Sequence, residues 1–146
     1  MIHELFCYLR PFDASAAIEF YKAAFGATEQ FRLNEPQTGR IGHVQLQFGP
    51  TIVMLSDAYP ERGLPAQDPA DPARFTIHIH VDNADEVIDA AIRAGATLTR
   101  PAADQFYGER SGTVLDPFGY TWLIGHTIEA VEPEEMQRRY DQPGAD

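Results

Sequence analysis

Apolar residues recur at helical spacing in two segments of the chain, and each segment is bounded by helix-capping residues. In the first, Asp13 precedes the apolar face and Gly26 follows it. In the second, Asn83 and Glu86 have the spacing of a capping box, and Gly95 ends the segment. We therefore predict one helix after Asp13 and another after Asn83.

Alternating apolar and polar positions, typical of half-buried strands, flank both predicted helices. One such run precedes each helix and three follow it. The predicted strands are 5–10, 29–33, 42–48 and 51–56 in the first half, and 75–81, 98–101, 112–115 and 120–126 in the second. Gly26 corresponds to Gly95 and Gly49 to Gly119, so the halves repeat one βαβββ unit at an offset of 69 or 70 residues.

The repeat predicts one domain over residues 1–146. Module 1 covers 3–57, a proline-rich linker covers 58–73, and module 2 covers 74–127. The tail 128–146 begins with a short helix near Pro133. The linker either connects the modules or folds over a site as a lid. A single unit covers only one face of its sheet with a helix. We therefore predict an α+β fold in which two tandem modules form a curved mixed sheet with a half-barrel cleft that binds small ligands.

Strand alternation divides side chains between the helices and the cleft. The helix-facing set of the strand 75–81 is Phe75, Ile77, Ile79 and Val81, which leaves Thr76, His78 and His80 in the cleft. Alternation also predicts that Cys7 is a small core residue and that Trp122 and Ile124 lie beneath the second helix. The predicted ligand-binding residues of the cleft are Tyr8, Arg10, His43, Gln45, His78, His80, Phe106 and Tyr107.

Phe106 and Tyr107 belong to a predicted loop before the seventh strand. Exposed aromatic side chains on such a loop stack on a flat ligand, cover the cleft mouth or pack at a dimer interface. Arg110, which follows them, either neutralises an anionic ligand or is a surface charge.

Charge and composition limit the classes of partner that the chain can bind. A formal net charge of −11 argues against nucleic acid, whose binders present basic patches. The acidity either keeps the chain soluble or attracts a cationic ligand. No stretch approaches the roughly 20 apolar residues of a membrane span, and the N-terminus does not resemble a signal peptide. The lone Cys7 excludes an intramolecular disulfide and a cysteine zinc site. We expect a cytoplasmic protein.

Two segments, ASAAIEFYKAAFGA at 14–27 and DPFGYTWLIGH at 116–126, resemble the vicinal oxygen chelate superfamily. That superfamily includes glyoxalase I, extradiol dioxygenases, fosfomycin-resistance enzymes and bleomycin-resistance proteins. DQFYGER at 104–110 and EPEEMQRR at 132–139 resemble its PhnB-like branch. The resemblance covers nearly the whole chain and implies the glyoxalase/bleomycin-resistance fold, which hosts several chemistries.

Enzymes of that superfamily hold a divalent metal with His, Gln or Glu from the first and last strands of each module. The resemblance places these positions at Phe6, Thr76, Leu123 and either Val53 or Met54. None of these side chains is a usual ligand of a divalent metal. We therefore expect no metal at the usual positions and no cofactor.

Three functions remain open, and with them the question of whether the chain is an enzyme. The first is a metal-free protein that binds a small molecule, in a sequestration or resistance-like role. The second is a divalent-metal-dependent lyase, transferase or dioxygenase with relocated ligands, namely His43, His78 and His80. The third is a protein-interaction domain. We expect a homodimer in each case, because half-barrel sheets leave edge strands that need cover.

Overall fold

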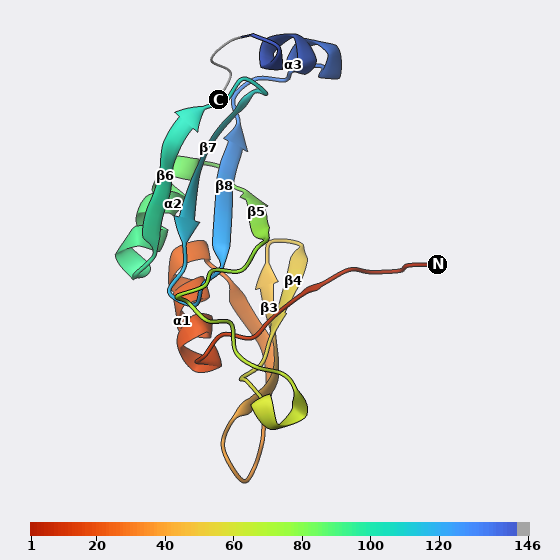
Figure 1. The fold of residues 1–146 in the computed structure, drawn as a ribbon, viewed down its shortest axis with the longest axis vertical. Coiled ribbons are helices and arrows are strands. Elements are labelled where there is room, and N and C mark those ends of the chain that lie inside the picture. The colour runs from red at the N-terminus through yellow and green to blue at the C-terminus, as the bar shows by residue number, and fades with distance from the viewer. Residues whose placement is uncertain (143–146) are drawn as a thin grey trace.

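The computed structural model describes residues 1–142, so the last four residues of the predicted tail lie outside it. The chain forms two four-stranded sheets that follow one another along the long axis of the molecule (Figure 1). Module 1 contains β1 (Cys7–Leu9), α1 (Ala14–Phe25), β2 (Thr28–Asn34), β3 (Ile41–Phe48) and β4 (Thr51–Leu55). Module 2 contains β5 (Thr76–His80), α2 (Ala84–Ala94), β6 (Thr97–Asp104), β7 (Glu109–Leu115) and β8 (Thr121–Thr127). The helix α3 (Pro133–Tyr140) follows.

Both sheets share one topology. Their strand orders are β1-β4-β3-β2 and β5-β8-β7-β6. The first strand of each module pairs in parallel with the last, and the other pairs are antiparallel. The predicted α+β fold with two βαβββ units is confirmed. The strand β6 continues past Pro101 to Asp104, because the ladder there is already irregular and tolerates proline.

The predicted helix caps are present. The Asp13 carboxylate accepts a hydrogen bond from a backbone N–H of the first turn of α1, at 2.9 Å. The Asn83 side chain accepts from two backbone N–H groups at the start of α2. Gly26 and Gly95 end the helices with positive φ values, which glycine adopts without steric cost. No helix among residues 1–142 combines the length and the apolar character needed to cross a bilayer.

The linker 58–73 packs beside module 1. It contains a short 3-10 helix, Pro60–Arg62, preceded by the buried Tyr59. The guanidinium groups of Arg40 and Arg62 lie 4.1 and 5.0 Å from the centre of the Tyr59 ring. The start of the linker is therefore held to module 1, and its end contacts module 2, where the backbone N–H of Ala73 donates to the Gly119 carbonyl at 2.8 Å.

The two modules meet through α1 and α2 and share an aromatic core. Trp122 of β8 is fully buried, and its ring lies 4.6 Å from that of Phe25 and 5.8 Å from that of Phe48. The prediction that Trp122 lies in the core is right, but its aromatic neighbours belong to module 1. Alternation identifies the face of a strand, whereas packing between modules decides which helix covers it.

A buried carboxylate joins module 2 to α1. Asp116 accepts hydrogen bonds from the Tyr21 hydroxyl and the Trp122 indole N–H, each at 2.8 Å. It also accepts from the backbone N–H groups of Phe118 and Tyr120. Burial raises the pKa of Asp116, and these four hydrogen bonds oppose the rise. The turn that follows Asp116 is thereby fixed to the first helix.

Two predicted core residues are exposed. Cys7 is exposed although its neighbour Leu9 is buried, and Phe75 is 48% exposed beside Tyr120. Cys7 begins the edge strand β1, and Phe75 immediately precedes the edge strand β5. Ile77, Ile79 and Val81 do pack against the core, as predicted.

Candidate functional site

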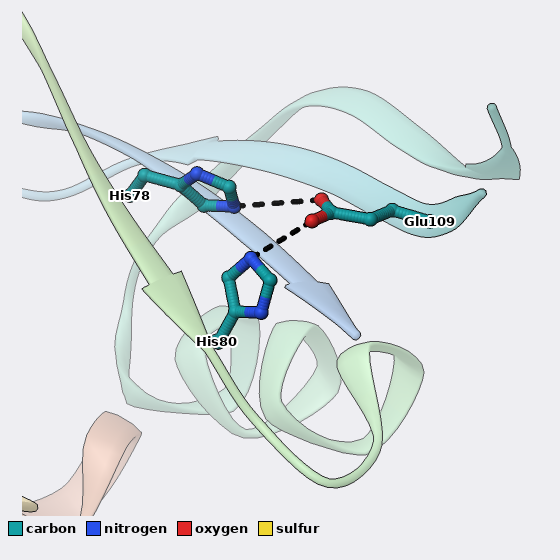
Figure 2. A group of neighbouring side chains, drawn as sticks. All are labelled: His78, His80 and Glu109. Carbon is teal, nitrogen blue, oxygen red and sulfur yellow. Dashed lines mark ion pairs between the residues drawn. The ribbon is translucent and has the colours of Figure 1, made fainter. Parts of the chain in front are cut away.

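Three ionisable side chains meet on the exposed face of the second sheet. His78 and His80 alternate along β5, and Glu109 begins β7. The His80 Nε2 atom lies 2.8 Å from the Glu109 Oε1 atom, and the His78 Nε2 atom lies 3.7 Å from Glu109 Oε2 (Figure 2). Among residues 1–142, this His78–His80–Glu109 cluster is the one group of three His, Cys, Asp or Glu side chains close enough to hold a metal ion.

A glycine on the intervening strand allows the cluster to form. The strand β8 lies between β5 and β7, and its Gly125 pairs with both His80 and Ser111. A Cβ atom at this position would lie 3.1 Å from Glu109 Oε2 and 3.5 Å from His78 Nε2. Because Gly125 has no side chain, groups from two strands that are not neighbours reach each other across it.

The cluster is partly desolvated. The Glu109 side chain is 16% exposed, and its Oε2 atom is buried without a hydrogen-bond partner in the described chain. Burial lowers the pKa of His78, the nearby His80 lowers it further, and the Glu109 carboxylate opposes the change. The surroundings therefore favour the neutral form of the His78 imidazole. A neutral imidazole can bind a metal ion or accept a proton.

A cavity of ≈ 410 Å³ lies where the modules adjoin. Both histidines of the cluster belong to its wall, and most of the remaining wall is apolar. The lining side chains include Cys7, Phe25, Phe48, Ile52 and Val53 of module 1, and Ile77, Ile79, Val81 and Trp122 of module 2. No residue of the linker 58–73 lines it, so the linker does not act as a lid in this structure.

The first sheet gathers other predicted cleft residues into a separate group. The Tyr8 hydroxyl lies 2.9 Å from the Nδ1 atom of His43, and the Gln45 amide lies 3.4 Å from its Nε2 atom. The Arg10 guanidinium lies 5.5 Å from the centre of the Tyr8 ring, and the Phe31 ring is 5.6 Å from that of His43. None of these residues lines the cavity. His43 thus lies on the other sheet from His78 and His80.

The aromatic loop is connected to the C-terminal helix. The rings of Phe106 and Tyr140 are 5.5 Å apart, and Arg139 donates a hydrogen bond to the Phe106 carbonyl. The Tyr107 hydroxyl lies 3.3 Å from the Ser111 hydroxyl, which places it beside the gap at Gly125. None of the three arrangements considered from the sequence included packing on α3.

Arg110 is paired with carboxylates of its own module. It contacts Asp85 at 2.7 Å and Asp104 at 3.0 Å. The surface-charge alternative therefore describes this side chain better than the neutralisation of an anionic ligand.

Sequence reasoning overlooked Glu109. The residue lies in the DQFYGER segment, immediately after the aromatic loop. Its signal was a carboxylate three residues before the predicted strand 112–115, and pairing it with His78 requires the strand order. The cluster also avoids the usual metal positions. Thr76 precedes His78 by two residues, and Leu123 is the register partner of His78.

Comparison with known proteins places this geometry in a family. A family model of the Glyoxalase/Bleomycin resistance protein/Dioxygenase superfamily matches residues 4–124. The uncharacterized protein Mb0911c of Mycobacterium bovis is 36% identical over 135 residues, which cover 90% of this chain and 88% of that protein. The uncharacterized protein Rv0887c of Mycobacterium tuberculosis is equally similar, over 79% of its length.

Solved structures share the fold at lower identity. The protein PA1353 of Pseudomonas aeruginosa matches with a TM-score of 0.69 and 23% identity, over 86% of this chain and 98% of that one. A glyoxalase-related enzyme of Fulvimarina pelagi matches with a TM-score of 0.68 and 23% identity, over 87% and 89%. TioX of Micromonospora sp. ML1 matches with a TM-score of 0.64 and 23% identity, over 89% and 100%. The chain belongs to the Glyoxalase/Bleomycin resistance protein/Dioxygenase superfamily.

Proposed function

We propose that this protein binds a small molecule whose apolar part enters the cavity and whose polar part meets His78 and His80. One observation carries the proposal, namely that the same two histidines belong to the polar cluster and to the wall of the apolar cavity. The volume of ≈ 410 Å³ lies within the range of about 300–1,000 Å³ that is typical of ligand pockets. A few convergent polar groups beside an apolar wall give such pockets their specificity.

The lining favours an aromatic or heteroaromatic ligand. Phe25 and Phe48 contribute ring surfaces, against which a flat molecule stacks, and the buried Trp122 lies next to both rings. The histidines and Glu109 supply the polar contacts. A sequestration or resistance-like role needs no further chemistry than this.

We also propose that the protein is a cytoplasmic homodimer of the PhnB-like branch. The branch assignment depends on the segments 104–110 and 132–139. The dimer would cover large apolar side chains that a single chain leaves exposed, among them Phe31, Leu33 and Leu98. Light scattering during size-exclusion chromatography tests the dimer: a mass of one chain at micromolar concentration would contradict it.

The chain contains its own reporter of ligand binding, because Trp122 is its only tryptophan and lines the cavity. A library of aromatic and heteroaromatic compounds should contain members that change Trp122 emission and raise the melting temperature. Substitution Ile52→Phe adds bulk to the cavity wall and should weaken that binding about tenfold, since overpacking costs about 1–3 kcal/mol.

The substitution Ile128→Phe is the matched control, because it adds the same bulk at an exposed position outside the cavity. Its affinity should equal that of the wild type. A library without any active compound, or equal effects of the two substitutions, would contradict a ligand in this cavity. Recovery of a tightly bound protein partner with the cavity empty would favour the interaction-domain alternative instead.

A further inference from the structure

We propose that His78, His80 and Glu109 form a three-ligand site for a borderline divalent cation such as Zn²⁺. The site differs from the positions that the superfamily usually employs, because its carboxylate comes from β7 and its histidines both come from β5. The proposal concerns ion binding by the chain alone and does not require a molecule in the cavity.

The donor set matches zinc. Two imidazole nitrogen atoms and one carboxylate oxygen are ligands that Zn²⁺ accepts readily. Three protein ligands leave one of the four tetrahedral positions open, which is typical of zinc sites that exchange a water molecule for a substrate group.

The distances also suit such an ion. The three donor atoms lie within 4.8 Å of one another. Zinc bonds of about 2.0–2.2 Å in tetrahedral geometry place donors roughly 3.3 Å apart. Each imidazole lies close to that distance from a different carboxylate oxygen, with His80 Nε2 2.8 Å from Glu109 Oε1 and His78 Nε2 3.7 Å from Glu109 Oε2. Small rotations of the side chains would complete the geometry.

Two features of the surroundings support a bound cation. The Oε2 atom of Glu109 is buried without a hydrogen-bond donor, an arrangement that is costly for a carboxylate unless a positive group satisfies it. Gly125 leaves open the gap across which the three side chains converge, and a Cβ atom there would lie 3.1 Å from that same oxygen. The unsatisfied oxygen therefore lies beside this gap.

The position of the site suggests what the ion would do. Because His78 and His80 also line the cavity, the open coordination position would lie at its boundary. There the ion would attract and polarise an oxygen or nitrogen atom of a small molecule, as a Lewis acid does. This step alone depends on the proposed function.

Zinc binding is measured on the full-length, untagged protein after treatment with chelator. Equilibrium dialysis against Zn²⁺, followed by elemental mass spectrometry, should give about one ion per chain. The substitutions Glu109→Gln and His80→Ala should each reduce the affinity at least about tenfold, since even changes outside the ligand set cost 10–100-fold. Zinc should raise the melting temperature of the wild type more than that of either variant.

The substitution His3→Ala is the control, because it removes an exposed imidazole that precedes β1 and lies outside the cluster. Its zinc affinity should equal that of the wild type. Circular dichroism checks that Glu109→Gln, which preserves shape, removes the charge and replaces one carboxylate oxygen by an NH₂ group, leaves the fold intact.

Absence of bound zinc, or equal affinity in the wild type, Glu109→Gln and His80→Ala, would overturn the site. Zinc bound through the cluster in a protein whose Trp122 emission responds to no compound would support the site while the proposed function fails. Ligand binding without zinc would have the opposite meaning, so the two failures are distinguishable.

Discussion

The exposed faces of the two sheets bear different side chains, although the two sheets have the same topology. Tyr8 on β1 and His78 on β5 occupy equivalent places, because their register partners are Met54 and Leu123 on the last strand of each module. Tyr8 contacts His43 through one hydrogen bond. His78 belongs instead to a cluster with a second histidine and a half-buried carboxylate.

The two faces also differ at one equivalent position on the last strand of each module. Ser56 follows Leu55 in module 1, and Gly125 follows Ile124 in module 2 at the equivalent place in the ladder. In module 2 the glycine leaves room for the shorter side chains of His78, His80 and Glu109 to converge, whereas the longer Tyr8 side chain reaches His43 across module 1 without a glycine between them. The repeat therefore supplies equivalent places, whereas individual residues decide which of the two faces can hold a charged group.

The largest difference between the modules should appear in the stability of their final turns. Substitution Asp116→Asn keeps one oxygen but puts an NH₂ group against the donors of Tyr21 and Trp122. We expect a loss of about 3 kcal/mol of unfolding free energy, from urea denaturation, because two buried hydrogen bonds to a charged acceptor disappear.

Gln47 lies in β3, just before the corresponding turn of module 1, and its side-chain amide donates an exposed hydrogen bond to the Gly49 carbonyl. Its replacement by alanine should change the unfolding free energy by less than about 0.5 kcal/mol. Equal losses in Asp116→Asn and Gln47→Ala would show that the buried carboxylate does not join the modules as described.

A smaller effect, on zinc affinity, is expected at Gly125, the position at which the two faces differ. Substitution Gly125→Ala places a methyl group 3.1 Å from Glu109 Oε2 and should displace that carboxylate. We expect about a tenfold loss of zinc affinity in equilibrium dialysis, the lower end of the effect of repositioned ligands. Ser56→Ala changes the equivalent position of module 1 and should leave zinc affinity unchanged. An unaltered affinity in Gly125→Ala would mean that the gap plays no part.

The smallest effect should come from the first sheet. Tyr8→Phe removes the hydroxyl that lies 2.9 Å from His43 on an exposed surface. We expect a loss of about 0.5 kcal/mol of unfolding free energy, the low end for a hydrogen bond, and no change in zinc affinity. A clear loss of zinc affinity would mean that the two faces are coupled in solution, and the contrast drawn between them would then fail.

Local patterns in the sequence predicted much of what the structure contains. The capping residues Asp13 and Asn83 and the terminal glycines Gly26 and Gly95 identified both helices, because caps depend on neighbouring backbone groups. Alternation also assigned Ile77 and Ile79 to the core, since successive side chains of a strand point to opposite faces.

The same local patterns misplaced residues where cover comes from elsewhere in the chain. Cys7 is on an edge strand and lines the cavity between the modules, and the alternation of its own segment could not predict that exposure. Trp122 packs on Phe25 of the first helix, because the modules meet through their helices. Neither outcome can be read from the segment that contains the residue.

By itself, the sequence determined the duplicated βαβββ unit, the helix ends and the face on which His78 and His80 lie, since each depends on interactions within a short segment. Tertiary structure alone decided that Glu109 joins these histidines and that His43 does not. The strand order β5-β8-β7 brings residues 29 positions apart, from His80 to Glu109, to either side of Gly125. Such proximity arises only when the sheet assembles, because no local pattern records which strands become neighbours or where a side chain is missing between them.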